Sequence, residues 1–428
     1  MSILDAYTKK YGKVEQVVSS LEDYLKLAKK DSSLYKTAPE RILKAIGEPI
    51  VLDTSKDTRL SRIFGNRLIR RYTPFEDFFG LEDVVDRIVS FFKHAAQGLE
   101  ESRQILYLLG PVGSAKSSIA ERLKELMEQE YIYVLADKEG KRSPINESPL
   151  GLFKVSDSTS LGIPPRYLTI KASPWAIKRL EEYEGDFTQF KVVKLKPSQD
   201  RQIAITKTEP GDENNQDIST LVGKLDIRKL EFFTQNDPDA YNYSGGLGLA
   251  NRGLLDFVEM FKAPIKVLNP LLTATQEKNY KGTESIGAIP FDGIILAHSN
   301  ESEWASFKGD NKNEAFLDRV YIVEVPYCLR VTEEVSIYKK LLNGSELKNA
   351  HCAPGTLQML AEFSVLSRLT DPENSSIYSK MEVYDGRNIK EKDVNAKSLQ
   401  EYMEASSAQE GFNGVSTRLA YKILSEVF

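Results

Sequence analysis

Nearly continuous apolar runs of strand length alternate, along the middle of the chain, with longer stretches whose apolar residues follow a helical period. The apolar runs are Gln104–Leu109, Leu254–Val258, Gly293–Ala297 and Tyr321–Val325. Uniformly apolar strands are typical of parallel sheets that are covered on both faces. Between the runs, stretches such as Leu81–Leu99 carry apolar residues at helical spacing, which predicts amphipathic helices. The pattern therefore predicts an α/β fold built on a parallel sheet.

The same pattern divides the chain of 428 residues into three parts. Residues 1–71 are predicted to form a helical N-terminal segment, and residues 72–330 the α/β core. The core strands are separated by more chain than successive βαβ units need, so we expect a large insertion at about 136–250. Residues 331–428 return to helical spacing and are predicted to form an all-helical module. Helices are expected in particular over 15–28, 39–46, 333–342, 354–369 and 416–427.

Composition narrows the class of protein. The chain is 41% hydrophobic, yet no apolar run approaches the roughly 20 residues of a membrane helix, so a cytoplasmic protein is expected. The net charge of −5 excludes a protein that binds nucleic acid or an anionic membrane by general electrostatic attraction. The 2 cysteines and 3 histidines do not stand at ligand spacing, which argues against structural zinc, a disulfide framework and a Cys/His nucleophile.

A glycine-rich turn follows the first apolar run and closely matches the phosphate-loop pattern G-x-x-x-x-G-K-[ST]. In such a loop, backbone N–H groups at a helix N-terminus surround a phosphate chain, a lysine reaches the outer phosphates and a hydroxyl binds Mg²⁺. Lys116 and Ser117 fit the last two roles. Ala115 stands where the pattern has its second glycine, and its Cβ is tolerable only if φ is negative. We expect a nucleotide site, rather than a turn that binds nothing, formed by Gly110, Pro111, Val112, Gly113, Ser114, Ala115, Lys116, Ser117 and Ser118.

Carboxylates at the tip of a neighbouring strand would complete such a site, one to bind the metal and one to activate water. Glu259 follows the run Leu254–Val258 and is the candidate base. Val258 occupies the position before it, where a metal-binding aspartate would normally stand. Asp256 lies two residues further back on the same strand face, roughly 6.6 Å away, and is a candidate metal ligand beside Ser117. The alternative is that both carboxylates are ordinary polar groups of a strand and a helix start.

The next apolar run ends in His298, Ser299 and Asn300. An amide at that tip can hold an attacking water or the outermost phosphate, which makes Asn300 a candidate, whereas His298 is expected in the core or beside the site. Arg319 precedes the final apolar run, and Arg418 opens the last helical stretch. Most single arginines are solvated, so these two acquire a role only from a family resemblance.

The chain resembles AAA+ ATPases of the magnesium-chelatase and MoxR kind in Ala250–Glu259, in Leu271–Glu277 and in the apolar run that ends at Asn300. More narrowly, it resembles the bacterial PrkA-type serine protein kinases from Met1 to Phe428. The segments specific to that resemblance are Leu60–Phe64, Lys93–Glu100, Lys262–Lys266 and Ile322–Arg330.

The resemblance implies an AAA+ fold with a nucleotide-binding core and a helical lid. It implies an ATP site in which Phe78 and Gly80 lie near the adenine, with Mg²⁺ as cofactor. Glu259 would be the Walker B glutamate and Asn300 the sensor 1 residue. Arg319 would reach the γ-phosphate of a neighbouring subunit in a ring of identical chains, and Arg418 would be the sensor 2 residue of the lid.

Three reactions remain open at this stage. The resemblance favours an ATPase module, which would release free phosphate, but a serine/threonine protein kinase that transfers the γ-phosphate to protein is an alternative. A third alternative is a nucleotide switch with little hydrolysis, which Ala115 and Val258 would favour. The sequence contains no His-Arg-Asp loop, Val-Ala-Ile-Lys strand or Asp-Phe-Gly triplet of a protein kinase. The family extends past the equivalent of Phe428, so the chain is expected to be its N-terminal and AAA+ portion, with a role in stress or nutrient signalling and an unidentified protein substrate.

Overall fold

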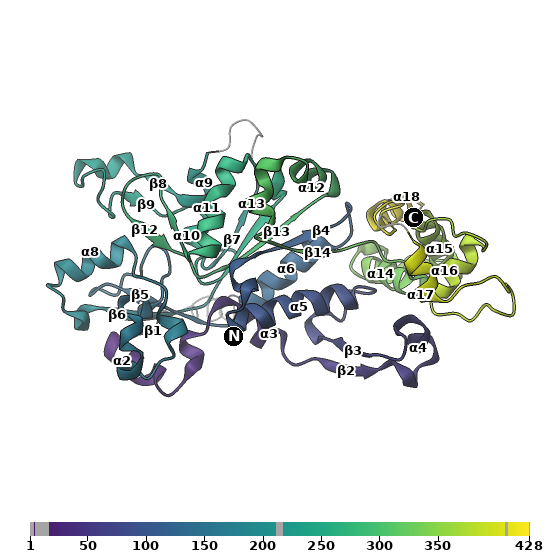
Figure 1. Cartoon of the computed structure of the whole chain (residues 1–428), viewed down its shortest axis with the longest axis horizontal. Coiled ribbons are helices and arrows are strands. Elements are labelled where there is room, and N and C mark those ends of the chain that lie inside the picture. The colour runs from purple at the N-terminus through teal and green to yellow at the C-terminus, as the bar shows by residue number, and fades with distance from the viewer. Residues whose placement is uncertain (1–3, 5–16, 211–216, 407–409, 428) are drawn as a thin grey trace.

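The centre of the protein is a sheet of five parallel strands (Figure 1). The structure is a computed structural model, and it describes residue 4 and residues 17–210, 217–406 and 410–427. The strands that the apolar runs predicted are all present, and their uniformly apolar sequences are explained by burial between two layers of helices. In spatial order the strands are β14 (Val320–Glu324), β4 (Ile105–Leu109), β13 (Ile294–Ser299), β10 (Leu254–Val258) and β7 (Ile205–Thr208).

The register of strand pairing aligns the carboxyl ends of these strands. Leu254 pairs with Ile294 in neighbouring strands, and Val320 pairs with Ile105, so the strands begin and end nearly level. Because the strands are parallel, the residues that follow β4, β10 and β13 emerge at one edge of the sheet. We call this the carboxyl edge; the residues that precede the strands lie at the opposite, amino edge.

Helices cover both faces of the sheet and form two hydrophobic cores with it (Figure 1). One face packs against three helices whose apolar stripes were predicted from the sequence: α3 (Ala38–Ile46), α5 (Glu82–Gln97) and α6 (Lys116–Met127). The other face packs against α10 (Gly246–Ala250), α11 (Ile265–Gln276), α12 (Glu301–Lys308) and α13 (Glu314–Leu317).

A second, antiparallel sheet stands beside the core and combines distant parts of the chain. Its order is β1 (Val17–Ser20), β6 (Lys191–Leu195) and β5 (Ile132–Ala136). With α2 (Leu21–Ala28), α7 (Ser158–Leu161) and α8 (Pro174–Glu182) it encloses its own hydrophobic core. We call this unit the side module. The helix expected over 15–28 therefore begins only at Leu21, because Val17–Ser20 pairs with β6 instead.

Two further segments differ from the expectation. The range 136–250 contains β7, which is the edge strand of the core sheet, so it is not one continuous insertion. β7 is short and partly polar, and its sequence alone gives no strand signal of the kind seen in the other four. Within the expected helical segment 1–71, β2 (Ile50–Asp53) and β3 (Leu68–Arg71) form an antiparallel pair around α4 (Thr58–Phe64).

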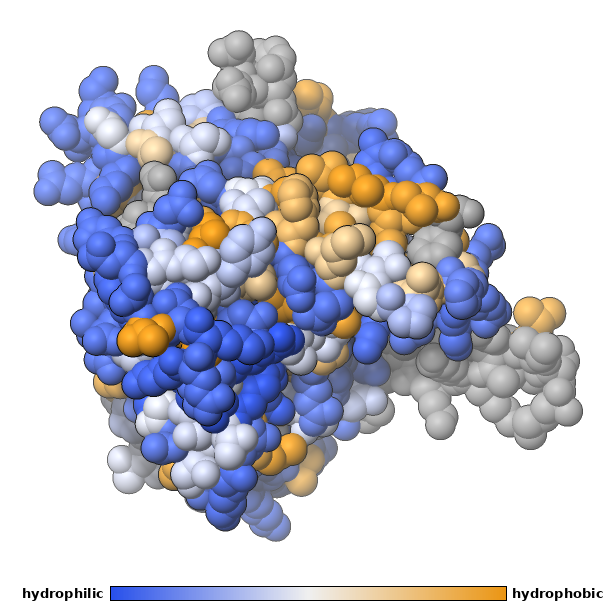
Figure 2. Space-filling model, turned by 90° about the vertical axis from the view of Figure 1, so that its right-hand side faces the viewer, coloured by the Kyte–Doolittle hydropathy of each residue, from blue (hydrophilic) through white to orange (hydrophobic). Residues whose placement is uncertain are grey.

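The last part of the chain is the helical lid that the sequence predicted. An ion pair between Arg368 and Glu334, 2.8 Å long and with both side chains fully buried, ties its helices together. Figure 2 shows apolar side chains gathered on the face of the molecule that carries the lid. No helix in the described ranges is long and apolar enough to cross a membrane. The lid helices are α14 (Val331–Asn343), α15 (Thr356–Arg368), α16 (Ile377–Tyr384), α17 (Leu399–Ala405) and α18 (Thr417–Val427).

Candidate nucleotide site

The phosphate loop joins β4 to α6 at the carboxyl edge of the sheet. The ammonium of Lys116 donates hydrogen bonds to the carbonyls of Gly110, at 2.6 Å, and Pro111, at 2.7 Å. A Cβ at position 110 would lie 2.2 Å from the carbonyl oxygen of Val325, so only glycine fits there. The hydroxyl of Ser114 is buried and has no hydrogen-bond partner among the described residues. The loop therefore offers unused polar capacity, which suits a phosphate-bearing ligand.

Ala115 has a left-handed backbone conformation. Its φ is +70°, although an alanine there was expected to be tolerable only at negative φ. The loop must turn sharply to direct its N–H groups at one point, and this residue continues into the first turn of α6. Such a conformation costs an L-residue roughly 1–2 kcal/mol, so the loop is held in a strained form.

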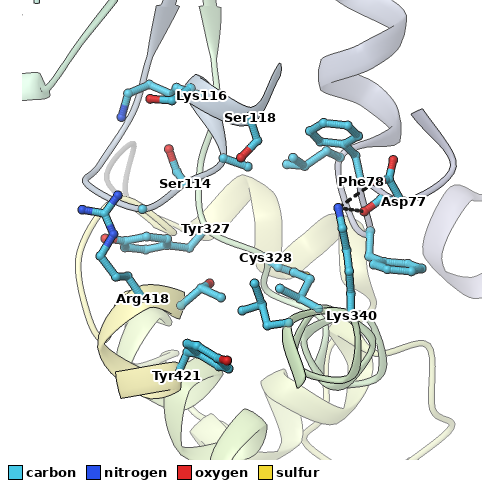
Figure 3. Close-up of a pocket in the computed structure, with 18 of the residues that line it drawn as sticks. Asp77, Phe78, Ser114, Lys116, Ser118, Tyr327, Cys328, Lys340, Arg418 and Tyr421 are labelled. Atoms are coloured by element: carbon cyan, nitrogen blue, oxygen red, sulfur yellow. Dashed lines mark hydrogen bonds and ion pairs between the residues drawn. The ribbon is translucent and has the colours of Figure 1, made fainter. Parts of the chain in front are cut away.

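A cavity of about 320 Å³ separates the phosphate loop from the lid. Phe78 lines it on the core side, and Arg418 and Tyr421 line it on the side of α18 (Figure 3). The backbone of Arg418 approaches the loop so closely that a Cβ on Gly113 would lie 3.8 Å from the Arg418 amide nitrogen. The loop and the lid, which are distant in sequence, thus form one site.

Charged groups surround the Phe78 ring at the mouth of this cavity. Arg122 lies over the ring at 5.3 Å from its centre, and Lys340 of the lid at 5.2 Å. Both cations bind the carboxylate of Asp77, at 3.1 and 2.7 Å (Figure 3 shows the Lys340 contact). The Lys340–Asp77 pair therefore joins lid and core beside the ring. Gly80 lies behind the ring, where a Cβ would meet the Cys328 sulfur at 2.7 Å.

Two opposing effects act on the pKa of the Lys116 ammonium. Burial lowers the pKa of Lys116 to about 8, while the negative charges of Glu303 and Glu301 oppose the shift. Both glutamates belong to α12, which begins immediately after β13. An anion bound beside this lysine would favour its charged form.

Glu259 follows β10 at the same edge of the sheet. Its amide donates to the His298 carbonyl at 2.8 Å, which fixes the end of the strand, and its φ is +49°. Its carboxylate binds the ammonium of Lys262 at 2.6 Å, and the same ammonium lies 3.5 Å from Glu303. One oxygen of Glu303 is buried without a hydrogen-bond partner, and burial raises the pKa of this residue. Lys262 is thus shared between two carboxylates, only one of which it fully neutralises.

The Asp256 carboxylate already contacts two other side chains. Its side chain is buried and pairs with the Lys124 ammonium at 3.0 Å and with the His298 ring at 3.5 Å. Burial would raise the pKa of Asp256, but the interactions with His298 and Lys124 outweigh it and lower the pKa. A buried carboxylate beside an ammonium and an imidazole is well explained by packing between β10, α6 and β13. Within the described ranges, no group of three or more His, Cys, Asp or Glu residues could hold a metal ion.

The other two predicted residues lie at opposite edges of the sheet. Asn300 occupies the N-cap position of α12 directly after β13, at the carboxyl edge, and its side chain makes no capping hydrogen bond to the helix. Arg319 precedes β14 at the amino edge, where its guanidinium contacts the Gln276 side chain at 3.1 Å. The intervening strand β4 is five residues long, or about 16 Å, so Arg319 is remote from the phosphate loop of its own chain.

Several site residues were not predicted from the sequence. No catalytic motif pointed to Lys262 or Glu303. The position of a lysine three residues after a candidate base does indicate a possible ion pair between them. Asp77 and Lys340 are brought together only by closure of the lid on the core.

Comparison with protein families identifies the chain. The model described as the PrkA AAA domain matches residues 19–376, most of the chain. The chain belongs to the PrkA family. A second model, the PrkA serine protein kinase C-terminal domain, matches residues 378–428 of this PrkA-family protein. The change between the two models falls inside the helical lid, at the start of α16.

Two curated relatives extend over nearly all of this chain. It is 61% identical to the serine/threonine kinase YeaG of Escherichia coli K12, an alignment that covers 100% of this chain and 67% of that protein. It is 34% identical to the ATP-dependent protease PrkA of Bacillus subtilis, over 97% of this chain and 65% of that protein. The chain thus spans about two thirds of the length of these relatives. Among solved structures, the magnesium chelatase BchI–BchD complex is similar, with a TM-score of 0.38, 18% identity and coverage of 72% of this chain and 79% of that one.

Proposed function

We propose that this PrkA-family chain binds ATP in the cavity between its core and its lid, and hydrolyses it. The observation that carries the proposal is the meeting of the phosphate loop, Arg418 and Phe78 around one cavity. Lys116 and the loop amides of 110–118 would hold the phosphates, with the Ser114 hydroxyl as a further donor. The face of Phe78, with Lys340 and Asp77 beside it, would receive the adenine.

The site suits a Mg²⁺ ion that binds together with the nucleotide. It is commonly held by one or two protein groups together with substrate phosphates, and at those phosphates it neutralises charge. Ser117, at the first turn of α6, can supply one such group. Asp256 was the second candidate; its Oδ2 pairs with Lys124, whereas its buried Oδ1 lies 3.5 Å from the His298 ring and has no hydrogen-bond partner among the described residues.

Hydrolysis would use the residues at the carboxyl edge. Glu259 would take a proton from the attacking water, and Asn300 would orient that water or the γ-phosphate. Arg418 would neutralise phosphate charge from the lid. Because Arg319 lies at the amino edge, it would contribute only across an interface with a second copy of the chain, as in a ring.

Two other reactions fit parts of these observations. The name of the E. coli relative describes a serine/threonine kinase, which favours transfer of the γ-phosphate to a protein hydroxyl. The pairing of Asp256 and the presence of Val258 before Glu259 favour a nucleotide switch that hydrolyses slowly. The B. subtilis relative is named as an ATP-dependent protease, so protein cleavage also belongs among the outcomes to be measured.

One experiment separates these reactions. The chain is incubated with γ-labelled ATP, Mg²⁺ and a protein acceptor, and the label is partitioned between free phosphate, protein and unchanged ATP while the acceptor is followed on a gel. Free phosphate that is lost in Glu259→Gln, with ATP binding retained, supports hydrolysis, because an amide cannot accept the proton. Labelled protein would indicate a kinase, acceptor fragments a protease, and bound intact ATP a switch. Absence of ATP binding to the wild-type chain would refute the proposal.

A further inference from the structure

Two arginines are buried without a carboxylate partner. Arg41 of α3 and Arg252, in the loop before β10, are each only 2% exposed. The Arg41 guanidinium donates to the Arg252 carbonyl, and the Arg252 guanidinium donates to the carbonyl of Tyr133 in the side module. Neither forms an ion pair with any carboxylate of the described residues. This is unusual, because buried charges are normally paired.

Unused hydrogen-bond donors gather at the same place. The Nε atoms of Arg41 and Arg252 are buried and have no partner within the described ranges, and the same is true of the Tyr24 hydroxyl. Tyr24 lies close enough for the charge of Arg252 to counteract the effect of burial on its pKa. Buried donors without partners need an explanation such as a bound ion or ligand, and Arg252 is the member of this group that also lines a cavity.

A cavity of about 390 Å³ opens beside these arginines, at the amino edge of the sheet and away from the candidate nucleotide site. Arg252, Lys278 and Asp292 all line it. The Lys278 ammonium donates to the Ser102 carbonyl and has no ion pair among the described residues. The Asp292 carboxylate makes neither a hydrogen bond nor an ion pair with them; burial raises the pKa of Asp292, and the charges of Lys278, Arg252 and Arg41 oppose that shift.

The charges around this cavity do not balance. The lining holds four cations against three carboxylates: Arg103, Arg166, Arg252 and Lys278, and Glu101, Glu277 and Asp292. Buried Arg41 beside Arg252 adds one cation, and Glu40, which pairs with Arg166 at 2.7 Å, adds one carboxylate, so the excess is one positive charge if all these groups are ionised. Burial lowers the pKa of Arg41 to about 9, which still leaves it charged at neutral pH. An anionic ligand would compensate this excess, and a phosphate monoester is an anion whose oxygens accept charge-assisted hydrogen bonds from Arg and Lys.

We propose that this cavity binds a small phosphate-bearing anion. Arg252 and Lys278 would contact its phosphate, while Arg41 would stabilise the complex through its charge. Asp292 would repel a second anionic group and accept a hydrogen bond from a hydroxyl, which favours a hydroxylated phosphate monoester over inorganic phosphate. The cavity volume suits a ligand of that size.

The test begins from the Lys116→Ala chain, so that phosphate binding at the phosphate loop does not contribute. Inorganic phosphate and glycerol 3-phosphate are titrated by calorimetry and by the shift of the thermal midpoint, with sodium chloride at equal ionic strength as control. Both phosphates should bind and raise the midpoint, because a ligand of the folded state stabilises it. Glycerol 3-phosphate should bind more tightly.

Three variants in this background decide the assignment. Lys278→Met and Arg252→Met should each weaken phosphate binding at least tenfold. Asp292→Asn should tighten the binding of inorganic phosphate severalfold, because it removes a like charge, and a gain in affinity cannot arise from misfolding. Lys171→Met, on the side module outside this cavity, is the matched control.

The outcomes are distinct. No binding of either phosphate to the Lys116→Ala chain would overturn the proposal, and would indicate that water satisfies the donors. Binding that is unchanged by Asp292→Asn and Lys278→Met would also overturn it, because the anion would then lie elsewhere. Binding of inorganic phosphate alone would retain the anion site and refute the preference for a hydroxylated monoester.

Discussion

The Glu259 carboxylate lies 2.6 Å from the Lys262 ammonium, three residues along the chain. The candidate base is therefore held in an ion pair, and its partner also lies 3.5 Å from Glu303. Both members of the pair are substantially exposed, so the pair contributes about 1 kcal/mol or less. Exchange of Lys262 from Glu259 to Glu303 would release the base at small cost, and the buried unpartnered oxygen of Glu303 is ready to accept it.

Lys262→Met should therefore raise the ATP turnover of the chain, by at most about fivefold given the strength of an exposed ion pair, with little change in ATP affinity. Steady-state phosphate release at saturating ATP measures the effect. Lys266→Met, which removes an exposed lysine of the same segment, should leave turnover unchanged. Adding Glu259→Gln should abolish the gain. A fall in turnover in Lys262→Met would show instead that the lysine orients the base.

The low pKa of Lys116 predicts a pH dependence of ATP binding. In the free chain burial lowers the pKa to about 8, and bound phosphates would raise it, so the complex binds more protons than the free protein near pH 8–9. Affinity should thus be greatest below about pH 8 and fall, by up to tenfold per pH unit, above it. Calorimetry in buffers of different ionisation enthalpy should detect proton uptake at pH 8.5. Lys116→Arg, which stays charged, should show a flat profile wherever it binds.

The left-handed conformation of Ala115 predicts a stabilising substitution. Ala115→Gly should raise stability by about 0.5–1 kcal/mol, because relief of the strain exceeds the entropy lost by glycine on folding. The thermal midpoint of the ligand-free chain measures this effect. Ala120→Gly, at a helical position of the same α6, should destabilise by about 1 kcal/mol. If both variants lose stability equally, the loop conformation is not strained.

The position of Arg319 predicts complementation between inactive chains. Arg319→Ala should lower turnover by about 10³-fold or more with ATP affinity nearly intact, whereas Lys116→Ala should lose both. Mixing the two variants should restore part of the activity, because an intact phosphate loop can meet an intact Arg319 at one interface. Phosphate release from the mixture, with sizing to demonstrate mixed assemblies, tests this. Mixed assemblies without recovered activity would show that Arg319 takes no part in hydrolysis and only contacts Gln276.

Much of the core could be predicted from local pattern. β4 is apolar throughout and β10 and β13 are mostly apolar because both faces of the sheet are covered, and that burial leaves a direct signal in the sequence. The strand β7 lacks the signal because it is only four residues long and partly polar, whereas the other edge strand, β14, is mostly apolar. Val17–Ser20 was predicted to be helical, but it forms a strand that pairs with β6 (Lys191–Leu195). The local sequence does not show this pairing, because it depends on residues far along the chain.

For the candidate site, the sequence by itself indicated the phosphate loop, because Gly110, Lys116 and Ser117 stand at the fixed spacing of such a loop, although Ala115 replaces its second glycine. It also placed Glu259 and Asn300 after buried strands, and parallel strands bring such ends to one edge. Only the tertiary structure decided that Asp256 pairs with Lys124, that Lys262 holds Glu259, and that Arg41 and Arg252 are buried without an ion pair among the described residues. The physical reason is that a charged group's role depends on its neighbours and its burial, and folding sets both through contacts that no local pattern contains.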